Sequence, residues 1–426
     1  MKKFFTSALF KGLVWQVIGF FIGAGLVTGI RALMGLSTTD TFFFTEPAWV
    51  LGSFIGAISF LVGCGVTADW IKWARGIETH DEHEEHWHGW EKFINVSFDH
   101  KVIGIQYTLI ALALLAIGGT FALIFRTELA ASQLQFLTTE FQLFGQNGPQ
   151  LYNTLMSLHG IVMIISILLG ISGIINYAVP LLIGAADMSF PRLNAFSYWI
   201  AVPAAVTLIS SLFLGGFDTG WTGYPPLSSR APVGMQMFFM GVFIAGWSSI
   251  LGALNVVVTV IRMRAKGMAA MKMPIFVWAS LATSIIAMTA TQFIGLAFQL
   301  VMFQRLFGMG FFDPSKGGNP VLFQHLFWFY SHPAVYVFIL PGLGVISELL
   351  PVFVRKPLYG YRWIAMSSIG IALVGFVVWA HHMFTSGMNE YLRVPFMYST
   401  LLVSVPTGVK FFSWVATMWK GKISTP

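Results

Sequence analysis

Ten stretches of this 426-residue sequence are long and apolar enough to cross a lipid bilayer, and this pattern limits the fold most strongly. A transmembrane helix needs about 20 mostly apolar residues. Only 10% of the residues are charged, which is too few to cover a soluble surface of this size. We therefore predict an all-α polytopic membrane protein with about ten transmembrane helices. The predicted spans are residues 11–36, 47–71, 102–125, 152–184, 194–216, 233–261, 273–304, 320–352, 362–388 and 396–419.

The Lys and Arg residues are distributed unevenly between the predicted loops. With the N-terminus inside, seventeen of the 24 fall on the inner side and six on the outer side. Cytoplasmic loops carry such an excess, so we expect both termini in the cytoplasm. The position of these charges matters more than the net charge of +7, and we predict no nucleic-acid partner.

Five of the ten histidines lie in or at the ends of predicted spans: His159, His325, His332, His381 and His382. A helix rises about 1.5 Å per residue, which puts all of these except His325 at similar depths in the outer half of the bilayer. One intramembrane histidine is usually a hydrogen-bonded packing residue. Several at one level can bind copper, zinc or haem iron.

The other polar features of the sequence have simpler interpretations. The inner loop HDEHEEHWHG, with His80, His83, His86 and His88, is predicted to be a solvated loop, with a weak metal site as the alternative. His100 is predicted to lie at the membrane interface. Cys64 is the only cysteine, so it forms no internal disulfide and is predicted to be a packing residue.

Two further side chains at membrane depth suggest proton chemistry. Lys410 lies about nine residues from the inner surface, which is farther than its stem reaches, so we favour a buried proton relay over snorkelling. Tyr336 follows His332 by four residues, which puts both rings on one helix face. A phenol beside a metal-bound histidine could supply a proton or an electron. Asp187 lies at an inner helix end, eleven residues after Asn176.

Several strings resemble subunit I of the haem-copper oxygen reductases, the cytochrome and quinol oxidases. The resemblance runs in order from about residue 99 to 420. The matching strings are DHKVIGIQY (99–107), YNTLMSLHG (152–160), NYAVPLLIGAADMSFPRLN (176–194), TGWTGYPPLS (219–228), QHLFWFYSHPAVYVFILPGLGVIS (324–347), VWAHHMFTSGM (378–388) and VPTGVKFFSW (405–414).

The resemblance implies an oxygen site with one copper ion. His332, His381 and His382 would bind the copper, and Trp328 would pack nearby. Tyr336 would be cross-linked to His332 and would supply an electron and a proton when the O–O bond breaks.

The resemblance also implies two haems, one low-spin and one high-spin. His159 would be one of the two axial ligands of the low-spin haem. Arg126 would contact the periphery of that haem.

Two proton paths are implied as well. Lys410, Thr407 and Ser347 would form the path that reaches the tyrosine. Asp187 and Asn176 would open the second path. Both would draw protons from the cytoplasm, with oxygen reduced in the outer half of the membrane and protons pumped.

The sequence departs from the family at the end of the second path. Many members have a glutamate at the position of Ala334. Tyr330 and Ser331 precede His332 here, and this YSHP string resembles the variant subgroup that uses a tyrosine-serine pair. Efficient pumping through the second path is the property that this departure affects.

The second departure concerns the number of helices. Family subunits have twelve core helices, and this chain resembles the first eight in residues 102–426. They follow two extra N-terminal spans in residues 1–75 and a cytoplasmic His/Glu-rich loop in residues 76–101. No histidine follows His382, so the remaining haem ligands are expected on a second chain, a fragment that completes a split subunit I. A truncated relative without catalysis is the alternative. The extra spans contain no histidine, so they cannot replace those ligands.

Rival functions remain at this point. A nitric oxide reductase would be expected to lack the Tyr336 equivalent and the lysine path. A transporter or channel would be colourless, and an assembly subunit would be dispensable for turnover. For the oxidase we expect a subunit II-like partner and other oxidase subunits, cytochrome c or quinol as electron donor, O2 as substrate, and a prokaryotic cytoplasmic or equivalent energy-transducing membrane.

Overall fold

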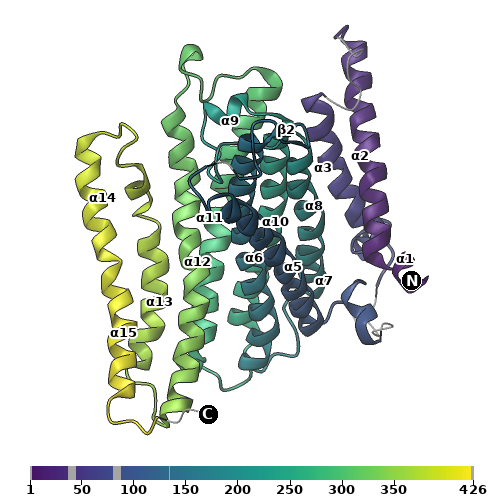
Figure 1. The fold of residues 1–426 in the computed structure, drawn as a ribbon. Helices are drawn as coiled ribbons and strands as arrows, with labels where there is room; N and C mark the ends of the chain where they lie inside the picture. Colours follow the sequence, from purple (N-terminus) through teal and green to yellow (C-terminus); the bar gives the residue numbers. More distant parts are fainter. Residues whose placement is uncertain (1, 37–44, 80–87, 134, 424–426) are drawn as a thin grey trace. The chain divides into compact units, whose positions relative to one another are not determined.

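The computed structural model of the chain describes residues 2–36, 45–79, 88–133 and 135–423. Its regular structure is almost entirely helical (Figure 1). The long helices are α2 (Ala8–Leu33), α3 (Glu46–Gly63), α5 (His100–Glu128), α6 (Gly148–Ile183), α10 (Val233–Arg262), α11 (Ile275–Phe307), α12 (Pro320–Val354), α13 (Tyr361–Gly375), α14 (Glu390–Leu402) and α15 (Ser404–Met418). The shorter elements are α1 (Lys2–Phe5), α4 (Ala68–Ala74), η1 (Gly89–Phe93), β1 (Gln142–Leu143), β2 (Gln146–Asn147), α7 (Pro191–Trp199), α8 (Ala201–Ser210), η2 (Ser211–Phe213), α9 (Leu227–Arg230), η3 (Ala270–Lys272), η4 (Pro314–Lys316) and η5 (Trp379–Met383).

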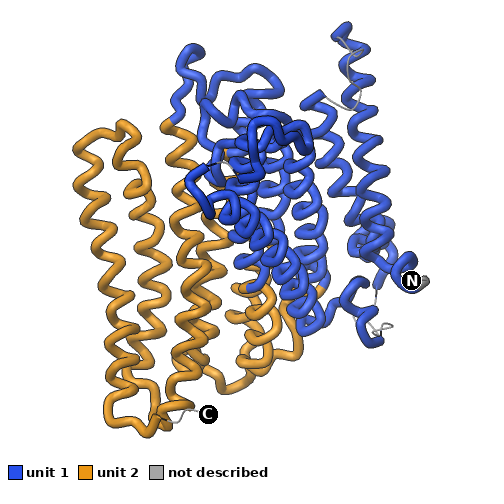
Figure 2. The backbone as a smooth tube through the Cα atoms, viewed as in Figure 1, with its two compact units in different colours: residues 1–170, 192–248, 298–320 blue, residues 171–191, 249–297, 321–426 orange. Residues whose placement is uncertain are grey.

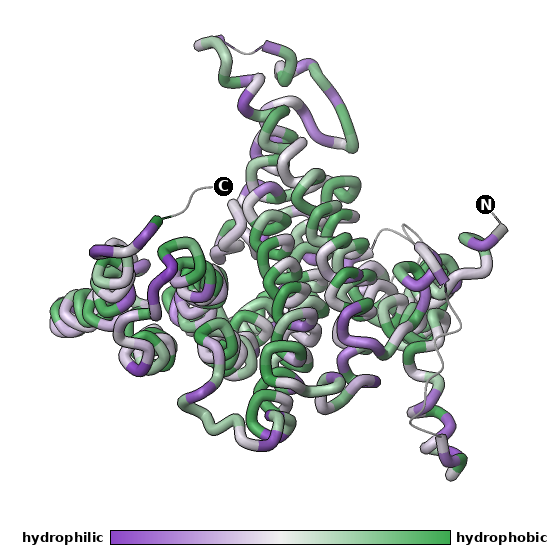
Figure 3. The backbone as a smooth tube through the Cα atoms, turned by 90° about the horizontal axis from the view of Figure 1, so that it is seen from below, coloured by the Kyte–Doolittle hydropathy of each residue, from purple (hydrophilic) through white to green (hydrophobic). Residues whose placement is uncertain are grey.

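Nine helical segments among the described residues are long and apolar enough to cross a membrane. The segments 191–213 and 390–418 each combine consecutive short helices into one span. Hydrophobic residues dominate the long helices, whereas hydrophilic stretches gather in the connecting segments (Figure 3). The predicted all-α polytopic membrane fold is therefore confirmed.

The predicted span 362–388 differs from the structure. Helix α13 ends after 15 residues, and the 3-10 segment η5 follows it. Fifteen helical residues rise about 22 Å, which is short of the hydrocarbon thickness of about 30 Å. No proline marks this break, so hydropathy alone extends the span across it.

The backbone divides into two compact units (Figure 2). Unit 1 comprises residues 1–170, 192–248 and 298–320. Unit 2 comprises residues 171–191, 249–297 and 321–426.

In unit 1, α2 and α3 form a tightly packed antiparallel hairpin. Glycines allow the two backbones to approach closely. A Cβ added at Gly23 would lie 2.8 Å from the Leu51 carbonyl oxygen, and one at Gly56 would lie 2.8 Å from the Gln16 carbonyl oxygen. Small residues at such positions are what membrane helix pairs use to gain van der Waals contact. The hairpin predicted as two extra spans is therefore a well-packed element.

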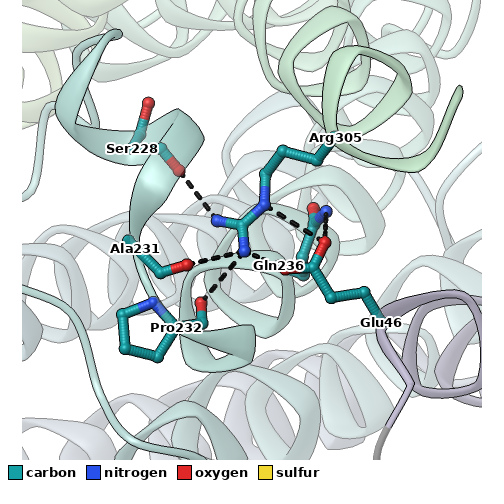
Figure 4. A network of polar contacts seen from close by, with 6 residues as sticks. All are labelled: Glu46, Ser228, Ala231, Pro232, Gln236 and Arg305. Atoms are coloured by element: carbon teal, nitrogen blue, oxygen red, sulfur yellow. Dashed lines mark hydrogen bonds and ion pairs between the residues drawn. The ribbon is translucent and has the colours of Figure 1, made fainter. Parts of the chain in front are cut away.

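An ion pair joins this hairpin to the rest of unit 1 (Figure 4). Glu46, the first residue of α3, pairs with Arg305 near the end of α11 and also accepts a hydrogen bond from Gln236 at 3.1 Å. The Arg305 guanidinium also donates to the carbonyls of Ser228 at 2.8 Å and Ala231 at 2.6 Å. Its side chain is 6% exposed, so these acceptors replace water.

Unit 1 carries a second polar cluster around α4 and η1. Arg192 donates to Asp69 on α4 at 2.8 Å, and its guanidinium lies 5.0 Å from the centre of the Trp73 ring. Lys3 forms an ion pair with Glu91 of η1. The predicted His/Glu-rich loop lies only in part within the described residues, because His80, His83 and His86 fall outside them.

The segment that joins α5 to α6 is organised by a buried carboxylate. Glu128 is 5% exposed and accepts backbone hydrogen bonds from Gln135, Phe136 and Leu137 at 2.8–3.1 Å. The hairpin β1–β2 follows, turning through residues 144–145, both with positive φ. Positive φ at both positions is the geometry of the two-residue turns that match the twist of a hairpin.

Unit 2 has its own hydrophobic core. It draws residues from the C-terminal ends of α6 and α10 and the N-terminal ends of α11 and α13, including Val179, Val260, Val277 and Ile364, all 0% exposed. Tyr361 packs against this core and donates a hydrogen bond to the Met273 carbonyl oxygen at 2.6 Å. These contacts fix α13 against α11.

Candidate active site

Three histidines of unit 2 form a compact cluster. His332 lies on α12, and His381 and His382 lie on η5. Their ligand nitrogens lie within 4.8 Å of one another, and His332 Nδ1 is 3.1 Å from His382 Nε2. Imidazole nitrogens suit copper, so this donor set fits the copper ion that the sequence predicts. The structure brings the three residues together, and their role as ligands stays a prediction.

Neighbouring side chains orient two of these rings. His381 Nδ1 is 2.9 Å from Thr400 Oγ1, and the Thr400 hydroxyl donates its own hydrogen to the Phe396 carbonyl at 2.6 Å. The hydroxyl must therefore accept from His381 Nδ1–H, which leaves Nε2 as the nitrogen available to a metal. The Trp328 ring stacks on His382 with centroids 3.8 Å apart and planes 6° apart. Trp328 thus lies beside the predicted copper site.

Tyr336 completes the cluster. Its hydroxyl lies 2.9 Å from His332 Nε2, one helical turn away on α12. The ring packs against Gly375, where an added Cβ would lie 2.8 Å from Tyr336 Cδ2. The contact between His332 and Tyr336 that the four-residue spacing predicts is therefore present. The phenol contacts Nε2 of His332, and His382 contacts its Nδ1.

Lys410 on α15 is fully buried. Its ammonium donates to the Ile364 carbonyl at 3.1 Å and to Ser368 Oγ at 2.7 Å, both on α13. A snorkelling lysine would extend its amine to water instead. The amine is therefore held inside unit 2 by two protein acceptors.

The other two residues of the predicted lysine path are Thr407 on α15 and Ser347 on α12. Thr407 lies one turn before the lysine and donates to the Val403 carbonyl at 2.9 Å. Ser347 on α12 is 1% exposed, donates to the Leu343 carbonyl at 2.7 Å and accepts from Trp414 Nε1 at 3.0 Å. The bond from Trp414 ties α15 to α12, the helix that carries the tyrosine eleven residues earlier.

The residues of the predicted second path lie around the C-terminal end of α6. Asn176 is 2% exposed within the helix. Asp187 is half-buried in the turn that follows and accepts from the Met188 N–H at 2.5 Å. Thr259 and Asn255 on α10 then accept the N–H groups of the next two residues at 2.9 and 3.0 Å. The turn that presents the aspartate is therefore fastened to α10.

Tyr330 and Ser331 lie on α12 just before His332 of the cluster. Tyr330 is 9% exposed and shares a hydrogen bond with Thr291. Ser331 is 5% exposed, and its hydroxyl has no hydrogen-bond partner among the described residues. A buried hydroxyl of this kind is a position where an ordered water would be expected.

The predicted haem ligand lies in unit 1. His159 is half-buried on α6, with Nδ1 2.9 Å from the Gly118 carbonyl oxygen on α5. Because a carbonyl can only accept, Nδ1 carries the hydrogen and Nε2 is left for a metal. This arrangement fits an axial haem ligand. Arg126 is exposed at the end of α5, next to Phe125, whose ring centre is 5.5 Å from that of His159.

One buried polar cluster was missed in the sequence. Tyr107 on α5 is 1% exposed, donates to Ser197 at 3.0 Å and lies 3.3 Å from Ser248 Oγ. Three hydroxyls at membrane depth in three different spans were the available signal. Hydroxyls of this kind are common in membrane helices, so the sequence alone does not distinguish these three.

Known proteins resemble this chain over the region that contains these sites. The family model described as "Cytochrome C and Quinol oxidase polypeptide I" matches residues 102–426. Cytochrome c oxidase subunit 1 of Synechocystis sp. is 48% identical over 336 residues, covering 78% of this chain and 59% of the relative. The same subunit of Thermostichus vulcanus is 47% identical over 345 residues, covering 80% and 60%. That of Corynebacterium efficiens is 42% identical over 334 residues, covering 76% and 55%.

These matches confirm the resemblance noted in the sequence. This chain spans between 55% and 60% of the length of the three relatives. The matched region contains every residue placed in the copper cluster and on the proton paths. The chain belongs to the family of subunit I of the cytochrome c and quinol oxidases.

Proposed function

We propose that this chain is the catalytic part of a respiratory terminal oxidase that reduces oxygen to water. The observation that carries the proposal is the cluster of His332, His381 and His382 with the Tyr336 hydroxyl at hydrogen-bond distance. Three imidazoles can hold a copper ion, and a phenol beside them can give a proton to a reacting oxygen. The membership of the chain in the oxidase family favours oxygen over other electron acceptors.

The chain's own residues would bind the metal and transfer protons. Copper and haem, when bound, would carry electrons from the donor to oxygen. Lys410, bonded to Ser368 inside the bundle, passes protons towards Tyr336, with Ser347 and Thr407 along the same path. The tie between Ser347 and Trp414 supports this path, because it keeps the lysine helix against the tyrosine helix.

A second path would serve proton pumping. It would begin at Asp187 and Asn176 on the inner side and end at Tyr330 and Ser331 in place of a glutamate. The unpartnered hydroxyl of Ser331 supports a water-filled end to this path. Both paths would take protons from the cytoplasm.

The haem sites would be completed by helices outside these 426 residues. His159 would be one axial ligand of the low-spin haem, with Arg126 at its edge, and the remaining ligands would come from elsewhere. We propose that a second polypeptide, a fragment of subunit I, brings them. Residues 102–426 would be the oxidase core, residues 76–101 a cytoplasmic loop and residues 1–75 an added pair of helices.

The complex would have further partners. A subunit II-like protein and other oxidase subunits would bind this core. The relatives are named cytochrome c oxidases, which favours cytochrome c over quinol as the donor. We place the complex in a prokaryotic cytoplasmic or equivalent energy-transducing membrane, with both termini on the cytoplasmic side.

The test is a gentle detergent purification of this chain with its natural partners. We expect copper, a two-haem reduced-minus-oxidised spectrum and oxygen consumption that greatly exceeds nitric oxide consumption. Intact mass spectrometry of each polypeptide then locates the missing haem ligands, which we expect on a separate small membrane chain. A colourless, copper-free complex would overturn the oxidase proposal, and faster nitric oxide consumption would replace its substrate.

A further inference from the structure

The segment that carries two of the three cluster histidines is the short 3-10 helix η5. The N–H of His381 donates to the Val378 carbonyl, three residues earlier, at 3.3 Å, and a 3-10 segment of this length makes only a few such bonds. The position of a segment of this kind depends on side-chain contacts with its neighbours. The flanking helices in unit 2 are α12 and α14.

Trp379, the first residue of η5, makes those contacts on both sides. Its ring centre lies 4.9 Å from that of Phe329 on α12 and 4.9 Å from that of Phe396 on α14. Ring packing is broad and tolerates sliding. The directional contact is the hydrogen bond from Trp379 Nε1 to His325 Nδ1 on α12, at 3.2 Å.

This bond ties η5 to the helix that bears the third histidine of the cluster. His325 lies seven residues, or about two turns and 10.5 Å, before His332 on α12. Because the donor lies on η5 and the acceptor at a fixed position along α12, this bond fixes how far η5 is shifted along the α12 axis. His381 and His382 follow the tryptophan by two and three residues, so their height depends on the same register.

We propose that the His325–Trp379 hydrogen bond positions the copper site. His325 and Trp379 are positioning residues: neither belongs to the histidine cluster, and both act through η5. The inference rests on the proposed function, because it assumes that the cluster binds copper. Outer contacts that orient metal ligands change metal affinity by about 10- to 100-fold when they are removed.

The test compares three substitutions in the complete complex. Trp379→Phe keeps a ring but removes the donor, and His325→Leu removes the acceptor. His325→Asn keeps an acceptor, because Asn Oδ1 can occupy the place of His Nδ1. Trp363→Phe on α13, a tryptophan that is 72% exposed, is the control.

The readout is copper per complex after dialysis against graded copper chelator, with the copper electron paramagnetic resonance signal as a second measure. We expect Trp379→Phe and His325→Leu to lose copper at about tenfold or more lower chelator concentration. We expect His325→Asn and the control to behave as wild type. The haem spectrum and thermal stability of each variant report folding, and if Trp379→Phe does not fold, the two His325 variants decide the question.

Two results would count against the proposal in different ways. If the wild-type complex holds copper and both His325 variants retain it equally, the positioning role is wrong while the oxidase proposal stands. If the wild-type complex holds no copper at all, the proposed function and this inference are both wrong.

Discussion

Lys410 is fully buried, although an amine that carries a charge is normally solvated by water. Its amine has two acceptors on α13 and no exposed surface. A buried amine gains or loses a proton in response to small changes around it, which is what a relay needs. The same burial would be costly for a residue with a purely structural role.

We expect Lys410→Met to lower oxygen consumption by about a hundredfold, because a positioned proton donor typically contributes that much. Methionine has a similar length without charge, so the packing of α15 should survive. Copper content and the haem spectrum are the checks on folding. Lys422→Met, at an exposed lysine beyond the same helix, is the control and should remain at wild-type rate. Full activity in Lys410→Met would remove this residue from the proton path.

The site residues that could be predicted from the sequence are those whose side chains are unusual within a membrane. The three cluster histidines, Tyr336 and Lys410 stand out because charged or metal-binding side chains at that depth are rare. Thr400 did not stand out in this way, and His325 stood out among the span histidines but had no predicted role. Their importance comes from a single hydrogen-bond partner on another helix, and hydropathy and spacing along one chain carry no information about that partner.

At the scale of elements, the α2–α3 hairpin depends on how closely two backbones approach. Gly23 faces the backbone of Leu51 and Gly52 on α3, whereas Gly29 has no atom near a Cβ added there. The two glycines lie in one helix but in opposite surroundings. They therefore separate the effect of packing from that of helix propensity.

We expect Gly23→Ala to destabilise the protein by about 1–3 kcal/mol, because the new Cβ lies 2.9 Å from Gly52 Cα and the backbones must move apart. Gly29→Ala should cause no loss and should gain some helix propensity. Thermal unfolding of the purified complex, followed by tryptophan fluorescence, measures both. Equal effects of the two substitutions would mean that the close approach does not stabilise the hairpin.

The Glu46–Arg305 pair anchors the same hairpin. Glu46→Gln leaves a guanidinium that is 6% exposed without its carboxylate, which we expect to cost about 1–3 kcal/mol. The matched control is Glu390→Gln, whose partner Arg393 is 39% exposed and whose pairing is worth less than about 1 kcal/mol. Protease cleavage between α3 and α5 should be faster only in Glu46→Gln. Equal cleavage rates in the two variants would contradict the anchoring role.

Hydropathy predicted all of the membrane-spanning helices correctly except the span 362–388. Nine of the ten expected spans correspond to helices or helix pairs, because 20 apolar residues in sequence leave few other structures in lipid. The segment after Gly375 was expected to continue the span, yet it turns into η5. The departure there serves the histidine cluster and depends on contacts with α12 and α14, which no local pattern contains.

At the scale of the whole chain, orientation can be tested with the help of one natural feature. Cys64 is 6% exposed, so added cysteines can be labelled with little background. Met309 and Met271 lie in the connections at opposite ends of α11 and are 44% and 43% exposed. They form a matched pair of reporters.

We expect a membrane-impermeant maleimide to label Met309→Cys in intact cells. Met271→Cys should react only after the membrane is opened, because the Lys and Arg bias places its loop in the cytoplasm. Labelling is read by the mass shift of the chain. The reverse pattern would invert the topology, and with it the direction of proton uptake.

The hydrogen bonds of Lys410 also bear on how the chain enters the bilayer during synthesis. The span 390–418, which contains this lysine, has the lowest mean hydropathy of the nine, at 1.3. A lysine at the centre of an inserting helix costs about 2.5–3.5 kcal/mol on the translocon scale. Ile364 and Ser368 leave the ribosome before this lysine does. Both acceptors on α13 can therefore be in place at the translocon when the lysine arrives. We thus expect the short helix α13 to stabilise the last span as it enters the bilayer.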